Sequence, residues 1–229
     1  MKNFIILLSL FLGFLGFLIS APNAYAIPLY VGQEIYLSNG PGDIGGGEFG
    51  IHDWNNNSSS VLIHSSFCLE TNESIQTGST HKYMVDDISS GAVQGGAWGG
   101  NPDPLNPMTA FLFYNFYKGT LTGYDHSPTE ADKLQKAMWY IEEEYGEFNV
   151  GNPFDDGWND NDYVEMAWDA VDSGAWVGLG LVRVVNLTDD AGAYRQDQLT
   201  VIPEPATMLL LGTGLIGLAF LGRKKLFKK

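Results

Sequence analysis

Apolar segments occupy both ends of this 229-residue chain and limit the part that can fold as a globular domain. Residues 4–19 form an apolar run after Lys2, and small residues precede a cleavage point after Ala26. This is the pattern of a secretory signal peptide, so we expect residues 1–26 to be removed on export. Residues 206–222 form a second apolar run, which is long enough to span a bilayer. A single extracytoplasmic domain is therefore expected within residues 27–202.

The C-terminal apolar run has a specific border on each side. Pro203, Glu204 and Pro205 precede it, and the basic residues that follow it are Arg223, Lys224, Lys225, Lys228 and Lys229. Clustered Lys and Arg keep the end of a transmembrane helix on the cytoplasmic side. This order of parts resembles the PEP-CTERM sorting signal of Gram-negative bacteria, which an exosortase recognises and cleaves. The resemblance covers residues 203–229. It implies transit through the inner membrane, exosortase and the secretion machinery as partners, and the cell surface or extracellular matrix as destination.

The central segment is strongly acidic. It holds six of the 12 Lys and Arg residues but all except one of the 27 Asp and Glu residues. Phosphate contacts need clustered positive charge, so nucleic acid is excluded as a partner. Cys68 is the only cysteine of the chain, which excludes an internal disulfide. An unpaired thiol outside the cell is open to oxidation, so its presence requires a chemical reason.

Alternating periodicity predicts strands at both ends of the central segment. Candidate strands lie within residues 27–50, 61–70, 82–88, 176–187 and 194–202. In residues 61–70 the alternation puts Cys68 on the more polar of the two faces.

Three helices are expected between these strands. Pro107 begins a buried aromatic helix. Ser127 and Glu130 form a capping box for a second helix that runs to about residue 145, with glutamates 142–144 as a solvated end. A third helix follows residues 160–162 and ends at Gly174. We therefore expect an α+β domain, mainly a β sandwich or barrel-like sheet with about three helices.

Cys68 and Gln135 are the chemical candidates. Residues 67–70 read Phe-Cys-Leu-Glu on a strand, and residues 134–139 read Leu-Gln-Lys-Ala-Met-Trp on a helix, after the aromatic helix. Over residues 61–145 this resembles the thioester domain of bacterial surface adhesins. The resemblance implies that Cys68 and Gln135 form an internal bond, which Phe67 and Trp139 would shield. The chain departs from the family pattern at residues 134 and 138 and in a short spacing between the cysteine and the glutamine.

The chemistry that the resemblance implies is acyl transfer. The Cys68 thiolate attacks the Gln135 side-chain carbonyl and ammonia leaves. Holding the two groups in a near-attack geometry contributes about 7–11 kcal/mol. The thioester then reacts once with a nucleophile, a lysine amine on a surface protein or matrix polymer. We expect adhesion by covalent attachment, with no turnover and no cofactor.

Two other functions stay open. Aromatic strand faces and Gly-rich loops are compatible with a non-covalent carbohydrate- or matrix-binding structural protein of a biofilm. A cysteine hydrolase needs a base within hydrogen-bond reach of its sulfur. His64 lies about 13 Å from Cys68 along a strand, so His81 or His126 would have to approach through the fold.

Carboxylates also crowd residues 155–162. Asp156, Asp160 and Asp162 are weak candidates for a calcium site, because oxygen ligands at this density can hold the ion. Their spacing departs from the EF-hand pattern, so a solvated acidic loop before the third helix is the favoured interpretation. The four histidines of the chain are too scattered to indicate a zinc site and are expected at the surface or in loops.

Overall fold

The computed structural model describes residues 28–43, 45–54, 61–97, 100–144, 161–202 and 213. The signal peptide expected at residues 1–26 lies outside this part, as do Asp156, Asp160 and all of the sorting segment except Thr213. Within the described part, no helix combines the length and apolar character needed to cross a membrane.

Six antiparallel strands form the main sheet, in the order β3-β2-β1-β4-β7-β8. In chain order they are β1 (Glu34–Asn39), β2 (Phe49–Asp53), β3 (Leu62–Ser66), β4 (Tyr83–Ser89), β7 (Val182–Thr188) and β8 (Tyr194–Val201). Two short strands, β5 (Gly91–Ala92) and β6 (Asp103–Pro104), form a separate sheet.

The two outer strands of the main sheet approach each other. Just after β3, Cys68 pairs with Gln198 of β8 in an isolated antiparallel bridge. The Leu69 amide donates to the Asp197 carbonyl at 3.1 Å in the same place. The main sheet therefore closes partly on itself, which is the barrel-like form of the expected architecture and not a two-sheet sandwich.

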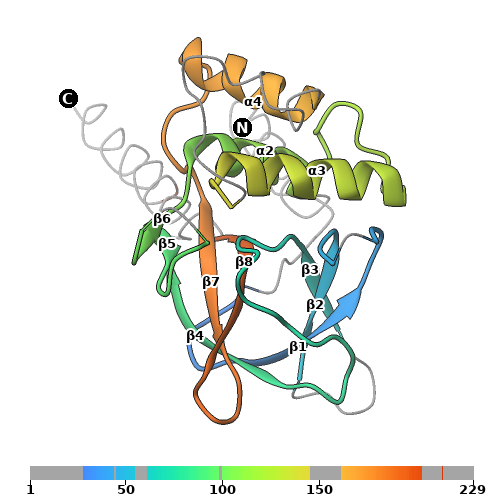
Figure 1. The fold of residues 1–229 in the computed structure, drawn as a ribbon, viewed down its shortest axis with the longest axis vertical. Coiled ribbons are helices and arrows are strands. Elements are labelled where there is room, and N and C mark those ends of the chain that lie inside the picture. Colours follow the sequence, from blue (N-terminus) through green and yellow to red (C-terminus); the bar gives the residue numbers. More distant parts are fainter. Residues whose placement is uncertain are drawn as a thin grey trace, which may run out of the picture.

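Three helices lie together at one end of the sheet, with α4 outermost (Figure 1). They are α2 (Pro107–Tyr117), α3 (Pro128–Ile141) and α4 (Asp162–Asp172). Their starts follow from local sequence: Asn106 accepts from the Met108 amide at 2.9 Å, and Ser127 accepts from the Glu130 amide at 3.2 Å. The prediction of an α+β domain with three helices is confirmed.

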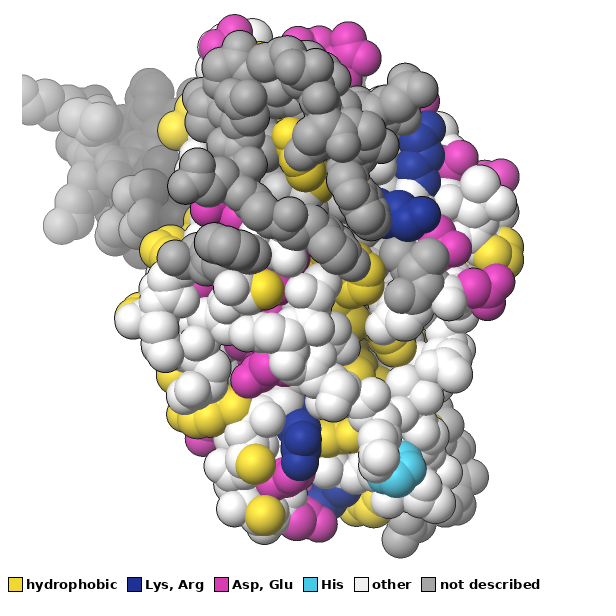
Figure 2. Space-filling model, in the orientation of Figure 1, with side chains coloured by type: hydrophobic (Ala, Val, Ile, Leu, Met, Phe, Trp, Pro, Cys, Tyr) yellow, Lys and Arg dark blue, Asp and Glu magenta, His cyan; other side chains and the backbone are white. Residues whose placement is uncertain are grey.

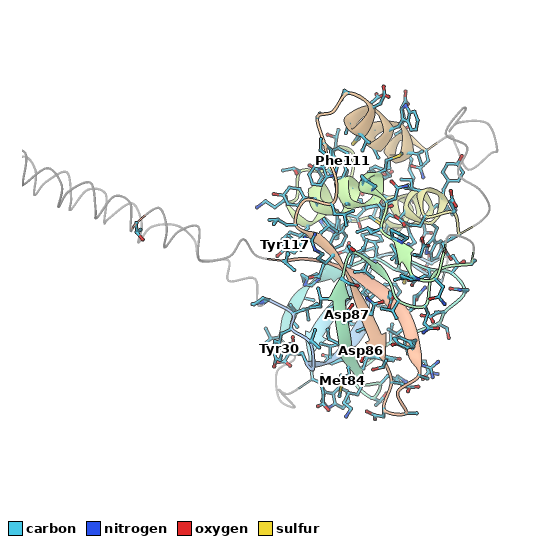
Figure 3. The ribbon with its side chains drawn as sticks, turned by 90° about the vertical axis from the view of Figure 1, so that its left-hand side faces the viewer. Tyr30, Met84, Asp86, Asp87, Phe111 and Tyr117 are labelled. Carbon is cyan, nitrogen blue, oxygen red and sulfur yellow. The ribbon has the colours of Figure 1, made fainter. Side chains whose placement is uncertain are left out.

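Two hydrophobic clusters lie on opposite faces of the strand that carries the cysteine. Phe67 and Leu69 belong to the cluster that the helices cover, whereas Cys68 belongs to the cluster inside the sheet. The alternation expected for residues 61–70 thus separates Cys68 from Phe67 and Leu69, and the partly closed sheet buries both faces of this segment. Figure 3 shows the two parts from one side, with Phe111 and Tyr117 on α2 above Met84, Asp86 and Asp87 on β4.

The end of α3 differs from the expectation. The helix stops at Ile141, and Glu142 and Glu144 are only 5% and 4% exposed. They are buried because each accepts backbone hydrogen bonds: Glu142 from Asn106 at 3.2 Å, and Glu144 from Thr71 at 2.6 Å. Both expectations, a helix to about residue 145 and a solvated glutamate end, are therefore wrong.

The predicted capping box forms only by half. The Glu130 carboxylate accepts from the Tyr163 hydroxyl at 2.5 Å, while the Ser127 amide donates to Asp125 at 2.9 Å. Glu130 therefore joins α3 to α4 instead of closing the box. The strand predicted at residues 176–187 begins only at Val182, so that prediction is too long at its start.

Candidate functional site

The side chain of Gln135 bonds both backbone polar groups of Cys68. The Cys68 amide donates to Gln135 Oε1 at 3.0 Å, and Gln135 Nε2 donates to the Cys68 carbonyl at 2.8 Å. In the bridge between Cys68 and Gln198 the hydrogen bond is made by the adjacent residues, because the Leu69 amide donates to the Asp197 carbonyl. In an antiparallel pair of this kind, the N–H and C=O of Cys68 itself point away from β8. The Gln135 side chain thus makes the two hydrogen bonds that the backbone of a neighbouring strand would make. Both residues are fully buried.

A second amide points at the same oxygen of Gln135. The Gly47 N–H donates to Oε1 at 3.2 Å, so the side-chain carbonyl accepts two backbone hydrogen bonds. Two preorganised N–H donors on one carbonyl oxygen are the arrangement that stabilises the oxyanion of acyl transfer. The site therefore polarises the carbonyl that the proposed attack requires.

The loop that carries Gly47 connects β1 to β2 and is held against α3. The Asp43 amide donates to Asp132 Oδ1 at 2.8 Å, one helical turn before Gln135. A Cβ on Gly46 would lie 2.5 Å from Trp139 Cη2 and 2.8 Å from Gln135 Cγ. Only glycine fits in this position, because the backbone itself covers the glutamine and the tryptophan ring.

Trp139 and Phe67 enclose the site from different sides. Phe67 packs edge-on against Phe116, with 4.9 Å between the ring centroids, in the helical cluster. Trp139 belongs to the inner cluster and lines a hollow of about 680 Å³. Asp43, Glu48 and Glu73 also line the hollow, and its lining within the described residues includes no Lys, Arg or His.

Figure 2 shows hydrophobic side chains in a hollow below the helices, with both acidic and basic side chains near it. The acidic residues Asp43 and Glu73, which line the hollow of about 680 Å³, attract a positively charged group and repel an anionic one.

The Cys68 sulfur is held as a neutral thiol. Burial raises the pKa of the Cys68 thiol, the Gln198 amide lowers it, and the Glu70 charge raises it further. Gln198 Nε2 donates to Sγ at 3.5 Å. Glu70 itself accepts from the Asp197 amide at 3.0 Å, and burial raises the pKa of both carboxyls, so this pair retains a proton at neutral pH.

Glu144 ties the segment after Cys68 to the end of α3. Its Oε2 accepts from both the amide and the hydroxyl of Thr71, at 2.6 and 2.8 Å, and its Oε1 accepts from the Ala97 amide at 3.0 Å. This buried carboxylate fixes the strand and the helix that carry the two candidate residues relative to each other.

The histidines do not reach the sulfur in the part of the chain that the structure describes. His64 lies on β3, where its Nε2 is 3.3 Å from the Leu199 carbonyl, and burial lowers the pKa of its imidazole to about 4. His64 is thus a half-buried strand residue whose side chain bonds the opposite strand. His126 Nδ1 lies 2.9 Å from the Glu48 carboxylate.

The one described member of the calcium candidates is engaged elsewhere. Asp162 accepts from Lys133 Nζ at 2.8 Å, and its side chain is exposed. Among the residues described, no group of three or more His, Cys, Asp or Glu side chains is placed to hold a metal ion.

Sequence reasoning missed two members of the site. Gly47 lies in the Gly-rich loop between β1 and β2, and Gln198 lies in the strand expected at residues 194–202; neither belongs to the motifs around Cys68 and Gln135. The run of glycines at residues 45–47 was the available signal for the first, because close backbone approach needs glycine. Gln198 had no such signal.

Comparison with known proteins identifies a sorting motif at the C-terminal end of the chain. The model of the PEP-CTERM protein-sorting motif matches residues 201–225. No curated protein and no solved structure matches the chain significantly. The motif marks an exported protein that passes through the membrane for sorting, with exosortase as its processing partner. It bears on the destination of the folded domain and not on its chemistry.

Proposed function

We propose that the folded domain forms an internal thioester between Cys68 and Gln135 and uses it once for covalent attachment to an amine at the cell surface or in the extracellular matrix. The observation that carries the proposal is the buried contact between the two residues. The Gln135 carboxamide bonds both backbone groups of Cys68, and its oxygen accepts two N–H donors.

The first step closes the thioester. The Cys68 sulfur attacks Gln135 Cδ, and the negative charge that develops on Oε1 is stabilised by the amides of Cys68 and Gly47. This attack forms a bond between Cδ and sulfur, and the bond between Cδ and Nε2 then breaks. The nitrogen takes up the thiol proton and leaves as ammonia. The step needs no oxidant and no cofactor.

The second step transfers the acyl group to the partner. A neutral amine attacks Cδ, the bond between Cδ and sulfur breaks, and a proton passes from the nitrogen to sulfur. The product is an amide between Gln135 and the partner, together with a free Cys68 thiol. The amine nitrogen takes the position that Nε2 occupies beside the Cys68 carbonyl, which accepts a hydrogen bond from it at 2.8 Å in the unreacted state.

The acidic hollow supports an amine as the nucleophile. Asp43, Glu48 and Glu73 line it, and Trp139 and Gly46 separate it from Gln135. The carboxylates of Asp43 and Glu73 attract a protonated lysine side chain, which must lose its proton before it attacks. The Glu48 carboxylate is bonded to Tyr124 and His126 instead. The partner is therefore an amine-bearing surface protein or matrix polymer.

The alternatives make different demands on the same residues. A cysteine hydrolase needs a thiolate and a nearby base, whereas Cys68 is buried with a raised thiol pKa and its Sγ accepts only from Gln198 among the described residues. A non-covalent matrix-binding protein would use the hollow without forming a bond. It predicts the full sequence mass and adhesion that does not depend on Cys68.

Intact mass spectrometry of the exported protein, purified without amine buffers, tests the proposal. The mass should be lower than the sequence requires by one ammonia, and the denatured protein should resist rapid iodoacetamide alkylation. Methylamine should add at Gln135 and expose the thiol. Cys68→Ala and Gln135→Ala should each abolish the mass loss and the methylamine addition. The full mass with a thiol that is alkylated at once in denaturant would refute the thioester.

A further inference from the structure

We propose that Gln198 is a catalytic residue of this reaction, whose side-chain amide stabilises negative charge on the Cys68 sulfur. The inference rests on the proposed function and adds a residue on the opposite strand. Its role is to assist the departure of sulfur when an amine opens the thioester.

The position of Gln198 follows from the closure of the sheet. Gln198 on β8 is the cross-strand partner of Cys68, so the two side chains project to the same side of the sheet. On its other side Gln198 is in register with Val185 of β7, which fixes its strand between two neighbours. The side chain is fully buried, so the amide is directed at the sulfur without competition from bulk water.

The contact with sulfur is direct. Gln198 Nε2 donates to Cys68 Sγ at 3.5 Å, within the range of an N–H···S hydrogen bond. Among the described residues, the Cys68 sulfur accepts a hydrogen bond from Gln198 alone. The nearby carboxyl of Glu70 opposes a sulfur anion, so the amide is the group that favours one.

The oxygen of the same amide has no partner. Gln198 Oε1 is buried and accepts no hydrogen bond within the described part of the chain. Rotation about the last side-chain torsion exchanges the two ends of the amide. The oxygen then faces the hydrogen of a neutral thiol, whereas the nitrogen faces a thiolate. One side chain thus matches both protonation states through which the sulfur passes.

The Gln198 N–H stabilises negative charge on sulfur both when the thioester opens and when it forms. When the amine opens the thioester, the electron pair of the breaking C–S bond moves to sulfur, and the Gln198 N–H meets the charge. A proton from the amine nitrogen then neutralises the sulfur. When the thioester forms, the thiol proton leaves with ammonia and the same N–H stabilises the attacking sulfur.

The test compares Gln198→Met with Thr200→Val in the exported protein. Met keeps the volume of the side chain and removes the donor. Thr200 is buried two residues further along β8, so its variant controls for loss of a polar group on this strand. The readouts are the thioester mass loss and the rate at which methylamine adds, both followed by intact mass.

Wild type and Thr200→Val should show the mass loss and equal opening rates. Gln198→Met should form the thioester but open about tenfold to a hundredfold more slowly, since a hydrogen bond to a charged group is lost. In the opened protein its thiol should also titrate at higher pH than the wild-type thiol. Opening at the wild-type rate, with an unchanged thiol titration, overturns the inference.

A second variant covers the case in which Gln198→Met does not fold. Gln198→Asn keeps the amide but withdraws it from sulfur by the length of one methylene group, so it should open more slowly than wild type. An equal or faster rate contradicts the role of the donor. Absence of the mass loss in wild type would instead defeat the proposed function itself, so the two failures are distinguishable.

Discussion

Replacement of Cys68 and replacement of Gln135 should each abolish the proposed reaction, yet the structure predicts very different losses of folding stability. The hydrogen bonds between the two residues in the structure join the Gln135 side chain to the backbone of residue 68. In Cys68→Ala these bonds remain, because the backbone is unchanged. In Gln135→Ala they are all lost, and so is the bond from Gly47.

The magnitudes follow from burial. Both residues are 0% exposed, so Gln135→Ala leaves the amide and carbonyl of Cys68 without a partner away from water. The buried Gly47 amide loses its partner as well, and at about 1–3 kcal/mol for each group the three together give about 3–9 kcal/mol. Cys68→Ala removes one buried sulfur atom and costs about 1–2 kcal/mol. Neither variant has the thioester cross-link, so its contribution cancels in the comparison.

Urea unfolding followed by tryptophan fluorescence measures the difference. Gln135→Ala should be less stable than Cys68→Ala by at least about 1 kcal/mol at a similar dependence on urea. Gln135→Met, which restores volume without hydrogen bonds, should stay close to Gln135→Ala. Equal free energies of unfolding for Gln135→Ala and Cys68→Ala would show that the glutamine does not satisfy the strand backbone.

Two further predictions concern the surroundings of the site. Gly46→Ala should lower stability by about 1–3 kcal/mol through overpacking and should slow methylamine addition, because its Cβ would lie 2.5 Å from Trp139. Gly45→Ala, whose Cβ meets nothing within 4 Å but whose φ is +83°, should show backbone strain alone; equal methylamine rates in both variants would contradict the steric account. Burial raises the pKa of Glu142 to about 8, so the folded state holds a proton that the unfolded state releases above about pH 4.5. Stability should therefore fall as pH rises from about 4.5 to about 8, and Glu142→Gln should flatten this part of the thermal-midpoint profile; an unchanged slope would show that Glu142 is not the source.

Local signals in the sequence located the helices, because caps and stop signals act within a few residues. Pro107 begins α2 and Ser127 caps α3 as expected, and Gly174 has the positive φ that ends α4. Alternation likewise located the strands. The buried glutamates after α3 could not be predicted, since a charged run usually faces solvent and only the fold directs backbone amides at Glu142 and Glu144.

The same distinction between local and long-range signals applies to the residues of the candidate site. Motifs pointed to Cys68 and Gln135, but their contact depends on how α3 meets the segment after β3, which no local pattern encodes. Gln198 is 130 residues from Cys68 in sequence, and it becomes a neighbour only because β3 and β8 meet. Closure of a sheet is a long-range property, so residues that depend on it carry no signal in a single sequence.

Burial of the pair acts in two opposite directions in the proposed reaction. It keeps water from the acyl bond, which lets a thioester survive until a partner arrives. It also raises the pKa of the Cys68 thiol, which makes sulfur a worse leaving group when the amine attacks. A site that is only buried would therefore be stable and unreactive. Two features offset this: the acidic hollow beside Trp139 concentrates the cationic nucleophile, and the Gln198 amide meets the charge on sulfur. The site combines resistance to water with reactivity toward amines only if both features act together.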